Sequence, residues 1–180
     1  MKAIILCAGR GSRLEPYTSD KPKCALEFLG TKLLDWQSIS LNHNGVEEIE
    51  VVTGYARENL KLGHRKTWVN KAWSKTNMVY SLLSARESLE SGEPIIIAYG
   101  DVIFEPRIIN LLKKCKSDIG VVIDLNWQSY WNIRLDDPLS DLETLKLNGN
   151  RIVEIGQKPN EISSIEGQYT GILYFSAIGA

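Results

Sequence analysis

The sequence has 180 residues and a formal net charge of −1 at pH 7, from 21 basic and 22 acidic side chains. This length suits one domain with a buried core. The balanced charge excludes an overall basic field for nucleic acid, and it excludes the acidic excess that is typical of disorder. The three cysteines show no C-x-x-C spacing, which argues against a disulfide framework or a cysteine zinc site.

No apolar run approaches the length of a membrane-spanning helix, and the apolar stretch at the N-terminus is too short for a signal peptide. We therefore expect a soluble, cytoplasmic protein with no membrane partner and no nucleic-acid partner.

Apolar runs alternate with amphipathic stretches along the first two thirds of the chain. The apolar runs predict strands at 3–7, 48–53, 94–99 and 118–124. The amphipathic stretches predict helices at 31–44, 76–90 and 106–115. Thr31 is the expected N-cap of the first helix and Gly45 its C-terminal stop. This alternation indicates an α/β fold with a mostly parallel sheet flanked by helices.

The pattern changes after residue 125, where short alternating runs predict a mixed or antiparallel C-terminal part. Expected strands lie at 131–135, 144–155 and 168–175. Within the second of these, Asn148-Gly149-Asn150 is a strong hairpin signal, because Asn-Gly readily adopts the positive φ of a tight turn.

The loop at 8–23 follows the first predicted strand and contains Gly9 and Gly11, which can expose backbone N–H groups to an anion. Arg13 and Lys23 could neutralise different oxygens of one triphosphate. The sequence therefore predicts a phosphate cradle, with a solvated surface loop as the alternative. Because the loop has no apolar periodicity, we expect a nucleotide to be the partner that orders it.

Four stretches together resemble a known family. The first, A-G-R-G-S-R-L-E-P-Y-T followed by P-K, is similar to the signature of nucleotidyltransferases that join an NTP to a phosphorylated sugar or alcohol and release pyrophosphate. The stretches YGDVIF, EIGQKP and YTGILYF resemble that family's metal-binding, acceptor-binding and strand elements. The resemblance implies a Rossmann-like fold of the GT-A type and one nucleotidyltransferase domain over 1–180, shortened at its C-terminus relative to the family. It leaves a homodimer open.

The resemblance also implies a set of site residues. The expected catalytic residues are Arg13, Lys23 and Lys158, and the expected ligand of a Mg²⁺ cofactor is Asp101. The expected nucleotide-binding residues are Ala8, Gly9, Gly11, Ser12, Thr76, Asn77 and Gly100. Two alternatives stay open: Asp101 could cap the turn after its strand, and Lys158 could be an exposed turn residue.

The W-x-x-T-N-M pattern at Thr76 and Asn77 resembles cytidylyltransferases that act on phosphocholine and on phosphonates. It implies CTP as donor and a small phosphonate or phosphoalcohol as acceptor, with 2-aminoethylphosphonate favoured over phosphocholine. Asn77 could instead be only a helix N-cap. A hexose-1-phosphate nucleotidyltransferase is a second possibility, although the hexose-type Q-x-x-P-x-G-L-A loop is missing and Gln157 replaces the usual glutamate. A catalytically silent nucleotide-binding or regulatory module is the third.

Residues that could bind the acceptor substrate can also be proposed without the resemblance. Trp131, with Trp127 and Tyr130, precedes Arg134 and the acidic residue Asp136. Aromatic faces and carboxylates suit an ammonium group, although such rings can equally be packing residues. A second candidate wall for the acceptor consists of Glu166, Gln168 and Tyr169.

Overall fold

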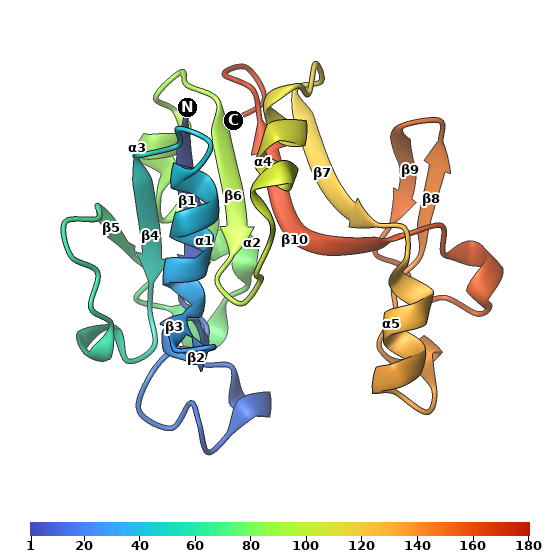
Figure 1. Ribbon diagram of the computed structural model, residues 1–180, viewed down its shortest axis with the longest axis horizontal. Coiled ribbons are helices and arrows are strands. Elements are labelled where there is room, and N and C mark those ends of the chain that lie inside the picture. Colours follow the sequence, from blue (N-terminus) through green and yellow to red (C-terminus); the bar gives the residue numbers. More distant parts are fainter. The chain divides into compact units, whose positions relative to one another are not determined.

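The computed structural model describes residues 1–180 and contains a six-stranded main sheet (Figure 1). The strand order is β5-β4-β1-β6-β10-β7. β1 pairs in parallel with β4 and β6, and β4 pairs in parallel with β5, whereas β10 is antiparallel to β6. The bounds are β1 Lys2–Cys7, β4 Ile49–Thr53, β5 Thr67–Val69, β6 Ile95–Tyr99, β7 Ile119–Asp124 and β10 Gln168–Phe175.

The helices and the two small sheets complete the fold. The helices are α1 Leu33–Asn42, α2 Met78–Leu83, α3 Arg86–Leu89, α4 Pro106–Lys113 and α5 Trp127–Arg134. None of them is long and apolar enough to cross a membrane. The small antiparallel pairs are β2 Glu27–Phe28 with β3 Thr31–Lys32, and β8 Leu145–Asn148 with β9 Arg151–Ile155.

Both faces of the central strands are buried, which explains their continuous apolar sequences. Every residue of β1 is buried. On one face, Ile4 and Leu6 pack in a cluster with side chains of α2 and α3. On the other face, α1 lies in front of the sheet in Figure 1, and its Gln37 donates a hydrogen bond to the carbonyl of Tyr99 at the end of β6, at 2.9 Å. The predicted α/β fold with a mostly parallel sheet is confirmed.

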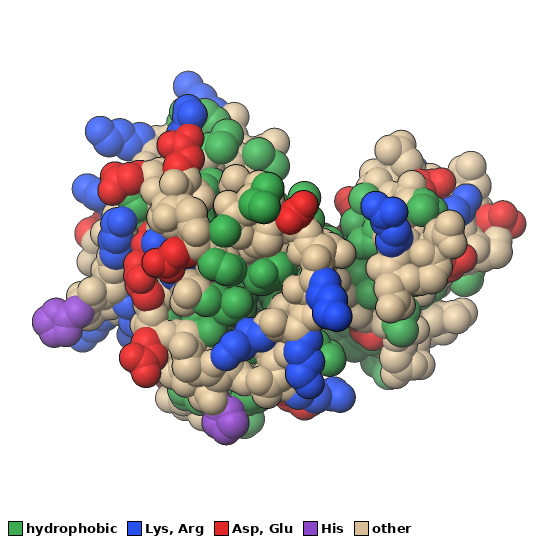
Figure 2. All heavy atoms as spheres, turned by 90° about the horizontal axis from the view of Figure 1, so that it is seen from above, with side chains coloured by type: hydrophobic (Ala, Val, Ile, Leu, Met, Phe, Trp, Pro, Cys, Tyr) green, Lys and Arg blue, Asp and Glu red, His purple; other side chains and the backbone are tan.

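The chain forms two compact units. The first comprises Met1–Gly120 with Gly171–Ala180, and the second comprises Val121–Thr170. The second unit has a small core of its own, formed by the buried side chains of Trp127, Leu142 and Ile165. Basic and acidic side chains are interspersed on the face shown in Figure 2, in agreement with the near-zero net charge. The interpretation of 1–180 as a single domain stays a prediction.

The hairpin at 148–150 is confirmed, because β8 and β9 pair through Asn148 and Arg151 and Gly149 has a φ of +60°. The strand predicted at 131–135 is wrong, since these residues belong to α5 and the coil that follows it. Trp127 and Trp131 are four residues apart and both pack on the core of the second unit, so the helical period decides the conformation.

The helix predicted at 76–90 is two short helices, α2 and α3, separated by Ser84 and Ala85. The hydroxyls of Ser81 and Ser84 return to backbone carbonyls four residues earlier, a local competition that weakens helix interiors. The first helix begins at Leu33 rather than after Thr31, because Thr31 pairs in β3. Strands β2, β3 and β5 were not predicted because they have only two or three residues each.

Candidate active site

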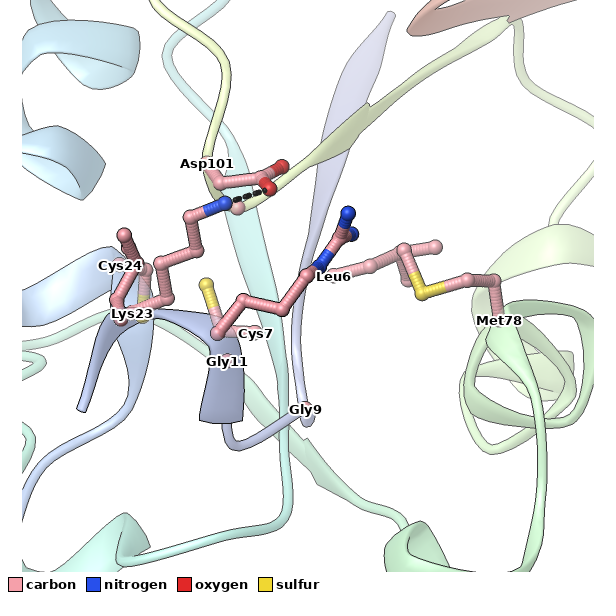
Figure 3. A pocket seen from close by; sticks show the side chains of 11 residues that line it. Leu6, Cys7, Gly9, Gly11, Lys23, Cys24, Met78 and Asp101 are labelled. Carbon is pink, nitrogen blue, oxygen red and sulfur yellow. Dashed lines mark hydrogen bonds and ion pairs between the residues drawn. The ribbon is translucent and has the colours of Figure 1, made fainter. Parts of the chain in front are cut away.

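A pocket with about 170 Å³ of internal space lies in the first unit, where β1 and β6 end (Figure 3). The carboxyl ends of strands in open α/β sheets are where ligands bind. The lining residues come from the opening loop, the strand ends and the start of α2: Leu6, Cys7, Gly9, Gly11, Arg13, Leu14, Lys23, Cys24, Met78, Gly100 and Asp101. The pocket therefore brings together Arg13, Lys23 and Asp101, which the sequence predicted as parts of one site.

The opening loop has the backbone that its glycines predict. Gly11 has a φ of +74°, and a Cβ there would lie 3.0 Å from the Cβ of Lys23. Ala8 is buried at the end of the strand, whereas Gly9 and Ser12 are exposed. A short 3-10 turn, Ser12–Leu14, follows and carries Arg13. Glycine at position 11 therefore allows the loop to fold back against Lys23.

Contacts with the rest of the protein hold the outer half of this loop. Thr18 is fully buried, and its hydroxyl donates to the carbonyl of Gly11 at 3.0 Å. The hydroxyl of Tyr55 lies 3.1 Å from the carbonyl of Thr18 and 2.5 Å from that of Ser19. The amide of Asn59 donates to the carbonyl of Asp20 at 2.5 Å. The expectation that a nucleotide orders the loop is therefore wrong for its outer half, because hydrogen bonds from polar side chains already hold that part.

Lys23 and Asp101 form an ion pair in the pocket, with 2.6 Å between Nζ and Oδ2 (Figure 3). Asp101 follows Gly100 directly after β6, and a Cβ at position 100 would lie 2.8 Å from the Cys7 sulfur and 2.8 Å from the Leu6 carbonyl. Only glycine fits there without displacing the end of β1. The carboxylate of Asp101 thus binds a lysine, and the turn-capping alternative finds no hydrogen bond in its support.

The fit of a magnesium ion depends on the available oxygen ligands. Asp101 is the only carboxylate that lines the pocket, and no three histidine, cysteine or acidic side chains are grouped as a metal cage. Mg²⁺ usually binds one or two carboxylates together with substrate phosphates, rather than an all-protein cage. The donor set therefore fits an ion that the nucleotide shares with Asp101.

Two thiols lie beside the charged pair. A hydrogen bond with the Cys24 thiol, together with burial, raises the pKa of the Cys7 thiol well above its usual value. These surroundings favour the protonated thiol over the more nucleophilic thiolate.

Thr76 and Asn77 lie at the start of α2, where Met78 enters the pocket. Oδ1 of Asn77 accepts the backbone N–H of Tyr80 at 3.1 Å, which is an N-cap. The hydroxyl of Thr76 donates to the carbonyl of Ala72 at 2.9 Å, so its single hydrogen is used within the segment. Asn77 retains its amide NH₂ for a ligand, whereas Thr76 has a structural role here. Sequence reasoning missed Met78 because an apolar residue after an N-cap carries no chemical signal.

Lys158 lies in the second unit, on an exposed turn. The turn is fixed by two hydrogen bonds between neighbouring segments: the N–H of Thr144 donates to the carbonyl of Gln157 at 2.7 Å, and the N–H of Gln157 donates to the hydroxyl of Thr144 at 3.2 Å. Pro159 is buried beside it. The ammonium is exposed on a braced turn, which suits an anion ligand, and its catalytic role stays a prediction.

The aromatic residues of α5 already have a cation over them. The guanidinium carbon of Arg134 lies 5.1 Å from the centre of the Tyr130 ring and 5.3 Å from that of Trp131. The indole nitrogen of Trp131 is buried and lacks a hydrogen-bond partner, and Asp136 is exposed. An ammonium-bearing acceptor would therefore compete with Arg134 for these faces.

The second candidate wall is largely engaged in structural contacts. A carboxylate oxygen of Glu166 accepts the N–H of Leu147 in β8 at 2.6 Å. Gln168 is buried, and its amide donates to the carbonyl of Glu143 at 2.9 Å. Tyr169 is half-buried within β10. Glu166 and Gln168 thus brace the hairpin of the second unit, and their role toward an acceptor stays a prediction.

Comparison with known proteins shows the family of the chain. Residues 3–132 match the MobA-like NTP transferase domain. The chain belongs to this nucleotidyltransferase family. The CTP:phosphoglutamine cytidylyltransferase of Campylobacter jejuni is 37% identical over 185 residues, which cover 98% of this chain and 73% of that protein.

Two further matches have names that give other acceptors. A UTP–glucose-1-phosphate uridylyltransferase of Haloferax volcanii is 30% identical over 94% of this chain and 71% of its own length. The solved structure of the inositol-1-phosphate CTP transferase from T. maritima superposes with a TM-score of 0.76 at 25% identity, over 97% of this chain and 70% of that one. Each of these relatives is longer than this nucleotidyltransferase chain.

Proposed function

We propose that this chain transfers a cytidylyl group from CTP to a small acceptor that carries a phosphate or phosphonate group, releasing pyrophosphate. The observation that carries the proposal is the convergence of Arg13, Lys23 and Asp101 in one pocket at the carboxyl ends of β1 and β6. The choice of CTP is supported by the named activities of the Campylobacter relative and the T. maritima structure, together with the W-x-x-T-N-M pattern.

The reaction is an in-line displacement. An oxygen of the acceptor's phosphate attacks the α-phosphorus of CTP, and the bond from that phosphorus to pyrophosphate breaks. The attacking oxygen is already anionic near neutral pH, so the site needs no general base. The barrier comes instead from bringing two anions together, and at about 4 Å the repulsion is roughly 1 to 4 kcal/mol per unit pair of charges. Positioning and charge neutralisation therefore supply the catalysis.

The residues of the pocket divide this work. Arg13 would hold the β- and γ-phosphates that leave, and Lys23 would exchange Asp101 for oxygens near the α-phosphate. Asp101 would hold Mg²⁺, which supplies charge neutralisation at the phosphate oxygens when bound. Lys158 does not line this pocket, and the proposal that it holds the phosphate of the acceptor rests on the family resemblance. We assign no step of the reaction to the Cys7 thiol, because its raised pKa favours the protonated form.

The acceptor is proposed as a small phosphorylated or phosphonylated metabolite. The sequence favours 2-aminoethylphosphonate and then phosphocholine, while the names of the relatives add phosphorylated glutamine and inositol 1-phosphate. Arg134 over the aromatic rings of α5 argues against a simple ammonium cage. Phosphorylated glutamine is the first acceptor to test, because the name of the 37% identical Campylobacter relative contains it, and 2-aminoethylphosphonate is the second.

A second candidate is a hexose-1-phosphate nucleotidyltransferase, which the Haloferax relative favours. The test measures pyrophosphate release for each of the four NTPs against phosphorylated glutamine, 2-aminoethylphosphonate, phosphocholine, inositol 1-phosphate and glucose 1-phosphate, with no-acceptor reactions as controls. Release that requires CTP and a non-hexose acceptor supports the proposal. Turnover only with a hexose phosphate would reject it in favour of the second candidate. No turnover with any pair, in a folded protein that binds nucleotide, would favour a silent binding module.

A further inference from the structure

The segment 70–77 joins β5 to α2, and its regular secondary structure is one 3-10 turn, Trp73–Lys75. It carries Thr76 and Asn77, and Met78 at the start of α2 lines the pocket. Some other interaction must therefore fix the position of this segment.

Asn70 provides that interaction. It is 1% exposed, directly after β5, and its backbone N–H donates to the carbonyl of Thr53 in β4 at 2.8 Å. Its amide nitrogen donates to the hydroxyls of Thr76 and Ser81, at 2.9 Å and 3.0 Å, and its amide oxygen accepts the N–H of Ala72 at 2.9 Å. The backbone N–H of Asn70 thus bonds to the sheet, whereas its side chain bonds to the segment 70–77 and to Ser81 in α2.

The bonds of Asn70 continue toward the start of α2. Thr76, which accepts from Asn70, donates in turn to the carbonyl of Ala72. Ser81, the second acceptor, donates to the carbonyl of Asn77 at 3.2 Å. A neutral amide has two N–H hydrogens, and both are used here, so no other common side chain of this size can make the same set of bonds.

We propose that Asn70 is a positioning residue for the nucleoside half of the CTP site. This inference rests on the proposed function. Asn70 acts through Thr76, Ser81 and the backbone of Asn77 to place Met78 and the Asn77 amide beside the nucleoside. The phosphate half of the site belongs to the opening loop and to Asp101, which make none of these bonds. Loss of Asn70 therefore weakens nucleoside binding and leaves phosphate binding intact.

The test compares two ligands that share the phosphate half of the site. Binding of Mg²⁺-CTP and of Mg²⁺-tripolyphosphate is measured by calorimetry on the full chain, for wild type, Asn70→Ala and Thr76→Val. Thr76→Val removes one hydroxyl at a partly exposed position, so it reports even if Asn70→Ala fails to fold. Ser84→Ala is the control, because that hydroxyl bonds only to the carbonyl of Tyr80 on the same helix and lies outside the network.

We expect the dissociation constant for CTP to rise by up to about 100-fold in Asn70→Ala, the size of loss that a small misplacement of binding groups can cause, and by a smaller factor in Thr76→Val. The constant for tripolyphosphate stays within about twofold in both, and Ser84→Ala matches wild type for both ligands. Equal losses for the two ligands, or unchanged CTP binding, would overturn the inference. The NTP that wild type binds best replaces CTP if it differs, so that a wrong choice of base would overturn that part of the proposed function and not the role of Asn70.

Discussion

Replacement of Lys23 by glutamine separates the catalytic role of this residue from its contribution to folding. Lys23→Gln keeps most of the length of the side chain and its hydrogen-bonding ability, and it removes the positive charge. In the structure that charge forms an ion pair with Asp101, with 2.6 Å between Nζ and Oδ2. During the proposed reaction it would face the α-phosphate instead. The two roles predict losses of very different size.

The folding loss is small because the ion pair is accessible to water. The side chains of Lys23 and Asp101 are 33% and 37% exposed, and ion pairs at such positions contribute about 0.2 to 1 kcal/mol. For a chain of this length that corresponds to a fall in Tm of at most about 4 °C. Removal of a charge that stabilises a transition state costs about 2.7 to 4 kcal/mol, or roughly 100-fold to 1000-fold in kcat.

The assay is pyrophosphate release at saturating CTP and acceptor, with Tm followed by differential scanning fluorimetry. Lys21→Gln is the matched control, because it makes the same substitution two residues away in the same loop, at a side chain that does not line the pocket. We expect Lys21→Gln to retain wild-type kcat. A kcat within about threefold of wild type for Lys23→Gln, at an unchanged Tm, would refute the reasoning.

Four further outcomes follow from the same site. Lys23→Gln should bind Mn²⁺ more tightly than wild type in the absence of nucleotide, because it frees the carboxylate of Asp101, and Asp101→Asn should abolish that binding. Electron paramagnetic resonance titration measures both affinities. Equal affinities in Lys23→Gln and wild type would contradict a competition between Lys23 and the metal ion for Asp101. In the proposed site the Asn77 amide would donate to ring N3 of cytosine, and Asn77→Asp keeps the N-cap but replaces this donor by an acceptor that suits the N3–H of uracil. The ratio of kcat/KM for CTP over UTP should therefore fall by about tenfold, whereas a ratio unchanged from wild type would remove Asn77 from base recognition. Tyr55→Phe removes the hydroxyl that holds the carbonyls of the opening loop, and it should raise KM for CTP severalfold with kcat nearly constant; a fall in kcat alone would contradict this. Gly100→Ala places a Cβ against the Leu6 carbonyl, and it should lower the free energy of unfolding by about 1 to 3 kcal/mol in urea titration, whereas a neutral result would mean that the strand ends can separate.

The sequence was most informative where function depends on residues close together in the chain. The glycines and cations of the opening loop lie within 16 residues of one another, and their spacing alone pointed to a phosphate site. Asp101 could be placed because strand ends converge in a parallel sheet. The predicted strands at 3–7 and 94–99 agree closely with β1 and β6, since both are continuous apolar runs buried on two faces.

Prediction failed where tertiary contacts decide the outcome. The pattern Trp-Asn-Ile-Arg-Leu alternates like a strand, yet it forms part of α5 because Trp127 and Trp131 share one small core. Asn70 is a single polar residue after a short strand, and nothing local indicates that its amide meets hydroxyls six and eleven residues later. The cation–π contacts of Arg134 likewise depend on a helix that the alternation concealed.

The anchoring of the opening loop bears on how the nucleotide would be bound. Fixing a loop on binding lowers affinity, because each ordered residue loses conformational freedom. Here Thr18, Tyr55 and Asn59 already hold the outer half of the loop by hydrogen bonds to its backbone, so that part of the loss occurs on folding. In the proposed reaction the Lys23 side chain would also leave Asp101 for a phosphate. Nucleotide binding in the proposed site would therefore include an exchange of charged partners.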